Sequence, residues 1–185
     1  MKIGPKEIFS IPNAVSTTGL GLVYDGSKKI DEPLGLLEVM AGRWMDLIDG
    51  PIARHTGQTS EFGATVDASF DKLGGLAILA AEWRKDVAPK PALAAIFAQN
   101  LINGIATVAA AKTHPSEDLR PSRAGKYAMF SQNIALSAYA SSKLLRRAQP
   151  KTAETLRNAG NLATVVGVGI FGVKATYDYI KRARA

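Results

Sequence analysis

Four aspartates occupy a short stretch of the sequence as two closely spaced pairs. Asp46 and Asp49 are three residues apart, and Asp67 and Asp71 are four residues apart. On an α-helix, residues at these spacings share one face. Two helices joined by the short segment between the pairs can face each other, so we expect the four carboxylates to converge in one place.

Small residues and one arginine accompany these acids. Gly50 and Ala53 fall on the face of the first pair, within a sector of roughly 100°, and Gly63 continues the stripe of the second pair. Arg54 follows directly after Ala53. The small residues leave room for a nucleotide diphosphate to approach the helix backbone, and an arginine can bind its phosphates.

The chemistry of such a cluster follows from its charge. Carboxylates at close quarters repel one another, so a cation compensates them or some stay protonated. Hard divalent cations prefer oxygen ligands, and Mg²⁺ binds through a few carboxylates together with substrate phosphates. The alternative is that each pair lies on a solvated helix face. Apolar neighbours favour the site, because acids in apolar surroundings are costly; they are Trp44, Leu47, Ile48, Phe62, Val66 and Phe70.

The elements that must carry these residues are predicted to be helices throughout, because no stretch alternates at a period of two. Prolines, glycines and polar breakers divide the chain into six segments. They run over about 13–29, 33–57, 61–85, 89–113, 123–147 and 153–185, with Ser60 as the N-cap of the third and a loop over 114–122. The third, fourth and sixth reach the ~20 residues that a membrane span needs.

Composition restricts the class of protein without deciding it. The chain has 185 residues, a net charge of +7 and no cysteine, which excludes disulfides and cysteine-ligated metals. Hydrophobic residues make up 46%, too many for a disordered chain. A soluble helical bundle and a membrane protein with a polar interior both stay open. Loop lysines and arginines balance between the two sides, so charge does not orient the chain.

The stretch from Asp46 to Asp71 resembles the signature of the CDP-alcohol phosphotransferases, D-x2-D-G-x2-A-R-x8-G-x3-D-x3-D, and every fixed position matches. The resemblance implies an all-α bundle of six transmembrane helices in the cell membrane, with a polar cavity open to the cytoplasm. Residues 1–185 would form one domain, with 1–12 as an interfacial segment. Such enzymes of phospholipid biosynthesis transfer a phosphatidyl group from CDP-diacylglycerol to an alcohol and release CMP.

The same resemblance implies roles for the motif residues. Four would bind Mg²⁺ or Mn²⁺, as two ions, and these are Asp46, Asp49, Asp67 and Asp71. Asp71 would also be the general base. The small residues and the arginine would bind the cytidine diphosphate, and these are Gly50, Ala53, Arg54 and Gly63.

A second stretch resembles the phosphatidylglycerophosphate synthases. Ser122-x2-Gly125-Lys126, followed by Gln132, matches their S-x2-G-K…Q pattern. It implies that Ser122, Arg123 and Lys126 bind a phosphorylated acceptor, with glycerol 3-phosphate preferred and inositol phosphate or another alcohol as the alternative.

The first segment resembles the family's P-N-x2-T opening, with Ser16 in the threonine place and Gly19 where an arginine is common. The family often forms homodimers and contacts membrane lipids.

A non-catalytic basic protein that binds acidic lipid or nucleic acid is a competing hypothesis. We expect no nucleic-acid partner, because the cations are spread over all the loops and no nucleic-acid motif is present. Prenyl transfer through aspartate-rich helices is a third hypothesis. It lacks support, because the Gly-x2-Ala-Arg element between the aspartate pairs belongs to the CDP-alcohol signature.

Overall fold

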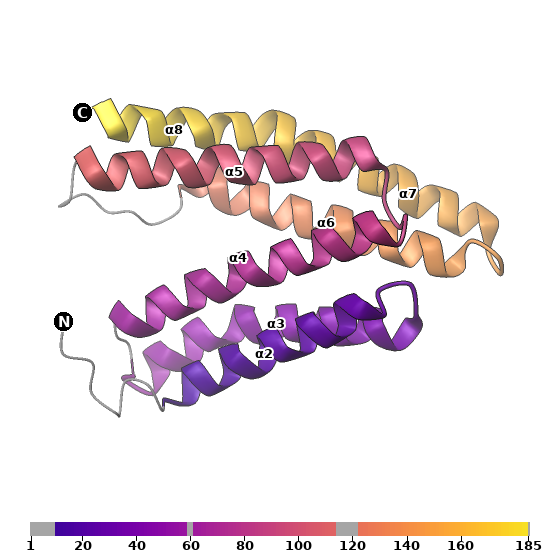
Figure 1. Ribbon diagram of the computed structural model, residues 1–185, viewed down its shortest axis with the longest axis horizontal. Coiled ribbons are helices and arrows are strands. Elements are labelled where there is room, and N and C mark those ends of the chain that lie inside the picture. Colours follow the sequence, from indigo (N-terminus) through magenta and orange to yellow (C-terminus); the bar gives the residue numbers. More distant parts are fainter. Residues whose placement is uncertain (1–9, 59–60, 114–121, 185) are drawn as a thin grey trace. The chain divides into compact units, whose positions relative to one another are not determined.

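The computed structural model describes residues 10–58, 61–113 and 122–184, and every regular element within them is a helix (Figure 1). The helices are α2 (Ile11–Lys28), α3 (Pro33–His55), α4 (Glu61–Arg84), α5 (Lys90–Thr113), α6 (Arg123–Leu145), α7 (Pro150–Thr164), the π-helix η1 (Val165–Gly172) and α8 (Val173–Arg184). The six predicted helical segments are confirmed, and the last is divided into three parts. The predicted cap Ser60, residues 1–9 and most of the 114–122 loop lie outside the described residues.

Local sequence explains where several helices begin and end. Pro33 and Pro150 occupy the first turns of α3 and α7, where a missing N–H costs nothing. The Ser122 hydroxyl caps α6 by accepting a hydrogen bond from the backbone N–H of Gly125 at 3.0 Å. Gly57, with φ of +66°, stands just beyond the end of α3, where a left-handed residue commonly stops a helix.

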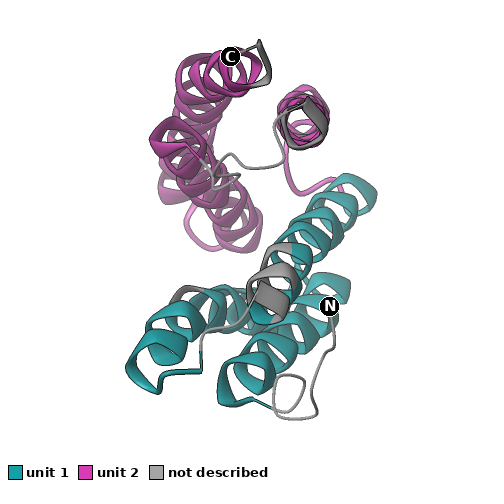
Figure 2. Ribbon diagram, turned by 90° about the vertical axis from the view of Figure 1, so that its left-hand side faces the viewer, with its two compact units in different colours: residues 1–85 teal, residues 86–185 magenta. Residues whose placement is uncertain are grey.

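The chain forms two compact units, residues 1–85 and residues 86–185 (Figure 2). In the first unit α2 packs against both α3 and α4. The α2–α3 pair touches through two glycine crossings. A Cβ on Gly42 would lie 2.4 Å from the Gly19 carbonyl oxygen, and a Cβ on Gly26 would lie 2.5 Å from that of Gly35. Glycines seven residues apart on each helix thus let the two backbones meet.

In the second unit α5 packs against α8, and α6 packs against α7 and η1. A polar contact joins α5 to the end of the π-helix: the Gln99 side-chain amide donates to the Gly172 carbonyl at 3.0 Å. Thr176 and Asn103 lie within hydrogen-bond distance of the same amide. A buried amide is thereby satisfied between two apolar helices.

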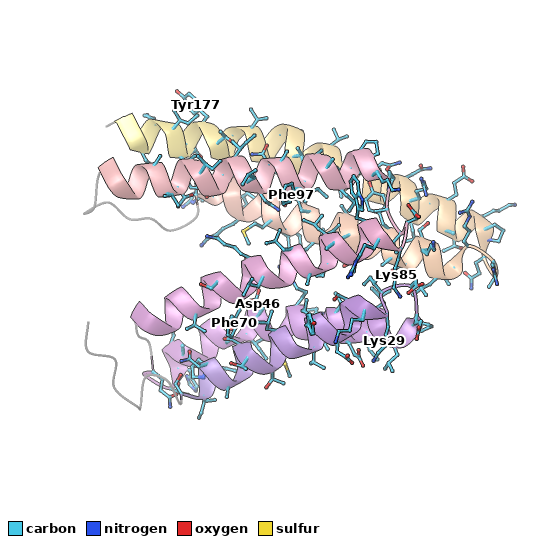
Figure 3. The ribbon with its side chains drawn as sticks, viewed as in Figure 1. Lys29, Asp46, Phe70, Lys85, Phe97 and Tyr177 are labelled. Carbon is cyan, nitrogen blue, oxygen red and sulfur yellow. The ribbon has the colours of Figure 1, made fainter. Side chains whose placement is uncertain are left out.

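The second unit exposes many large apolar side chains and buries several small residues, beside a few large ones such as Tyr139 and Ile96. Phe97 and Tyr177, both labelled in Figure 3, are exposed, whereas Ala135 and Ala175 are completely buried. Helices in lipid pack through small residues in this way, whereas a water-soluble bundle buries its large apolar side chains. The exposed large apolar side chains favour a membrane protein over a soluble bundle.

Two stretches of the described residues are long and apolar enough to cross a membrane, Lys90–Ala109 and Pro150–Arg182. Both lie in the second unit and were expected as spans, whereas the other segment expected to span, about 61–85, is not found as a span among the described residues. The helices of the first unit carry the charged motif residues and are less apolar. The full set of six spans and the cytoplasmic cavity stay predictions.

Candidate functional site

The acidic motif falls on two helices of the first unit. Asp46 and Asp49 lie on α3, and Asp67 and Asp71 lie on α4. The side chain of Asp67 is outside the described part of the structure. The other three carboxylates are partly or fully buried.

Arg43 joins the two helices at the motif. Its Nη1 atom donates to Asp71 Oδ1 at 2.7 Å and lies 3.7 Å from Asp46 Oδ2. The side chains of all three residues are at most one quarter exposed. Because Arg43 precedes Asp46 by three residues, the two share a face of α3. One guanidinium therefore compensates a carboxylate from each helix.

A small pocket opens beside this ion pair. Asp46 and Phe70, labelled in Figure 3, both line it, together with Arg43 and Gly74. Its volume is about 10 Å³, which is room for about one water molecule.

Asp49 takes a different partner. Its carboxylate is only 3% exposed and accepts a hydrogen bond from the Ser16 hydroxyl of α2 at 2.5 Å. The same hydroxyl lies 3.0 Å from the Pro12 carbonyl oxygen. The residue in the threonine place of the family's opening thus orients a motif aspartate.

The residues present fit a hard divalent cation in their chemistry. Asp46 and Asp71 offer only oxygen ligands, and a positive charge already stands against both of them. Among the side chains that the structure describes, no three acids or histidines gather at one point. The convergence of four carboxylates, which includes Asp67, therefore stays a prediction.

The predicted nucleotide-binding residues lie along the motif helices. Gly50, Ala53 and Gly63 are half-buried, and Arg54 is exposed. A Cβ on Gly50 would lie 3.5 Å from Arg54 Nη1, so the guanidinium extends back over the glycine. Gly50 and the Arg54 guanidinium are therefore direct neighbours on α3.

The predicted acceptor residues lie in the second unit, at the start of α6. Arg123 and Lys126 are exposed, and Ser122 is buried as the helix cap. Gly125 has a packing reason, because a Cβ there would lie 2.6 Å from the Tyr179 hydroxyl. The buried Gln132 side-chain nitrogen has no hydrogen-bond partner within the described part of the chain.

Sequence reasoning missed two contributors to the site. Arg43 is not part of the acidic signature, although its spacing from Asp46 places both residues on one helix face. The contact of Ser16 with Asp49 spans 33 residues, and no local pattern predicts it.

Comparison with known proteins agrees with the motif. The model of the CDP-alcohol phosphatidyltransferase family matches residues 10–171, which includes the whole acidic signature and parts of both units. Neither a curated protein nor a solved structure matches the chain. The chain therefore belongs to the CDP-alcohol phosphatidyltransferase family.

Proposed function

We propose that this chain transfers a phosphatidyl group from CDP-diacylglycerol to glycerol 3-phosphate and releases CMP. Its family implies phosphatidyl transfer in phospholipid synthesis, with a CDP-linked substrate and an alcohol acceptor. The observation that carries the proposal is the complete Asp46–Asp71 signature, two of whose carboxylates meet at one half-buried arginine.

The family generally depends on divalent metal. We assign the ligands of two Mg²⁺ or Mn²⁺ ions to Asp46, Asp49, Asp67 and Asp71, whose oxygen atoms suit hard cations. When bound, such ions neutralise the diphosphate and the departing CMP. Ser16 holds the Asp49 carboxylate in a fixed orientation, as partners of metal ligands commonly do.

The reaction then needs a base and a leaving group. Asp71 takes the proton of the acceptor hydroxyl as that oxygen bonds to the phosphorus carrying the lipid. The bond from this phosphorus to the bridging oxygen breaks, and CMP leaves with the electron pair. In the structure Asp71 Oδ1 accepts a hydrogen bond from Arg43, so the guanidinium must leave this oxygen before it can accept the proton.

The donor's nucleotide would lie on the two motif helices, α3 and α4. Gly50, Ala53 and Gly63 leave the helix backbone accessible to the cytidine diphosphate, and Arg54 binds a phosphate oxygen. Arg54 Nη1 lies 3.5 Å from the position that a Cβ on Gly50 would take, so a phosphate-binding cation stands directly beside this glycine.

The acceptor's phosphate would be bound at the start of α6. Arg123 and Lys126 offer exposed cations, and the Ser122 cap fixes the turn that carries them. The Ser122 hydroxyl accepts its bond from Gly125, so its own proton can still be donated to a phosphate.

An assay of CMP release tests the proposal. The purified protein in mixed micelles is supplied with CDP-diacylglycerol, Mg²⁺ or Mn²⁺, and one acceptor at a time. We expect turnover with glycerol 3-phosphate and about 10²-fold or greater loss in Asp71→Asn. Asp25→Asn, at an exposed aspartate outside the motif, is the control and should keep full activity. Near-normal turnover in Asp71→Asn would contradict the assigned base.

The acceptor panel separates the remaining alternatives. Turnover with inositol phosphate alone would favour the alternative that this chain is an inositol-type enzyme. The alanine after the third aspartate, Ala68, is similar to that subfamily's pattern. We further propose that both units form one domain with its active site facing the cytoplasm, and that it forms a homodimer. Crosslinking in native membranes tests the dimer, and protease accessibility of a tagged C-terminus tests the orientation.

A further inference from the structure

The ion pair at the motif places a fixed positive charge where the proposed metal ions would act. Arg43 donates to Asp71 at 2.7 Å and lies 3.7 Å from Asp46. A guanidinium stays charged at any physiological pH. A divalent cation bound by the same two carboxylates would be repelled by a guanidinium at this distance.

Arg43 lines a pocket that is too small for a diphosphate. The pocket, which Asp46 also lines, holds about 10 Å³, room for about one water molecule. Phe70 forms another part of the pocket wall. A diphosphate can therefore enter only if side chains around the pocket move, and the Arg43 guanidinium is among them.

A guanidinium displaced from the two aspartates loses two carboxylate contacts, and a new anionic partner offsets the cost of that loss. The substrate supplies one. Two phosphates of the donor arrive with the metal, and arginine binds phosphate oxygens in a bidentate manner. The long side chain of Arg43 is 18% exposed, so it borders the pocket rather than being sealed in the core.

We propose that Arg43 is a donor-binding residue that occupies the cation position until metal arrives, and then moves from the two aspartates to the diphosphate. This inference rests on the proposed function, because it requires a metal ion and a CDP-linked donor. It assigns Arg43 two opposing effects: competition with the metal before binding, and attraction of the donor afterwards.

The two effects give the substitution Arg43→Gln an unusual combination of outcomes. Removing the competing cation should raise the affinity for Mn²⁺, measured without donor, by about 10-fold. Removing the phosphate ligand should lower the affinity for CDP-diacylglycerol, measured with saturating Mn²⁺, by about 10- to 100-fold, the range of a hydrogen bond to a charged group. A residue that only supports the fold would weaken both.

The test measures binding rather than turnover. Mn²⁺ affinity is followed by electron paramagnetic resonance of the free ion, and donor affinity by retention of radiolabelled CDP-diacylglycerol in mixed micelles. Arg84→Gln, on an exposed arginine of α4, is the matched control and should change neither affinity. Arg43→Lys keeps a charge but loses the fork, so its Mn²⁺ affinity should stay near that of the unaltered protein while donor affinity falls about 10-fold.

Each result decides one statement. If the unaltered protein binds neither Mn²⁺ nor donor, the proposed function fails and this inference fails with it. If the unaltered protein binds both, and Asp46→Asn abolishes Mn²⁺ binding, but Arg43→Gln binds Mn²⁺ no more tightly, the inference alone is overturned. If Arg43→Gln does not elute as a folded protein, Arg43→Lys decides, and an unchanged donor affinity in it overturns the inference.

Discussion

Replacing Gly42 by alanine tests the close crossing of α2 and α3 beside the candidate site. The new Cβ would lie 2.4 Å from the Gly19 carbonyl oxygen, 2.7 Å from Val23 Cγ2 and 3.0 Å from the Val23 backbone nitrogen. Two of these atoms are backbone and cannot rotate away. Gly21, in the middle of the facing helix α2, is the matched control, because a Cβ there meets nothing within 4 Å.

The magnitude follows from two opposing effects. Either substitution gains about 1 kcal/mol of helix propensity. Only Gly42→Ala also overpacks a helix contact, which typically costs ~1–3 kcal/mol. The propensity gains cancel in the comparison, so Gly42→Ala should be about 1–3 kcal/mol less stable than Gly21→Ala. At ~2–4 °C per kcal/mol for a chain of this length, the two melting temperatures should differ by roughly 2–12 °C.

Thermal unfolding in detergent micelles, followed by tryptophan fluorescence, measures the difference. Both tryptophans of the chain, Trp44 and Trp83, lie in the first unit, so the signal reports the unit that contains the crossing. Because Gly42 lines the pocket with Asp46, Gly42→Ala should also slow CMP release. Equal melting temperatures for the two variants would refute the close approach.

Three further predictions concern the site and its surroundings. Ser16→Ala leaves the buried Asp49 carboxylate without its hydroxyl partner and should cost about 1–3 kcal/mol in unfolding free energy, whereas Thr18→Ala, at an exposed hydroxyl of the same helix, should change little. Lys126→Gln should raise the KM for glycerol 3-phosphate several-fold and leave that for CDP-diacylglycerol unchanged; equal changes in both would contradict an acceptor role. The protein should stay in the membrane pellet through a high-salt wash and leave it only with detergent, whereas release by salt would support the non-catalytic basic lipid-binding alternative.

Local rules were sufficient to predict the helices. Pro33 and Pro150 begin helices in the structure where the sequence predicted breaks, and Gly57 ends one. These signals act within a turn or two of the chain, so a single sequence contains them. The π-helix over Val165–Gly172 was not predicted. The Gln99 amide that bonds its last carbonyl lies 73 residues away, and no local pattern joins the two.

The residues of the acidic motif were predictable from the sequence, whereas the side chains that contact its aspartates were not. The spacing from Asp46 to Asp71 led to the family that the comparison confirms. The spacing does not predict that Asp49 accepts a hydrogen bond from Ser16 of α2, or that Asp71 pairs with Arg43 of α3. Those choices depend on which helices lie side by side, and the crossing that decides it is made by glycines, whose lack of a side chain leaves no hydrophobic pattern to read.

The glycine in place of the family's common arginine has a physical account in this arrangement. Gly19 meets Gly42 so closely that a Cβ on it would lie 3.0 Å from the Gly42 carbonyl oxygen and 3.1 Å from the Met45 Cβ, so a longer residue would force α2 and α3 apart. The pocket that Gly19 lines nevertheless contains a guanidinium, which Arg43 supplies from the facing helix. The departure from the family pattern therefore costs the site no positive charge. It exchanges a cation on α2 for tighter packing of α2 against α3, and that packing also brings the Ser16 hydroxyl to Asp49.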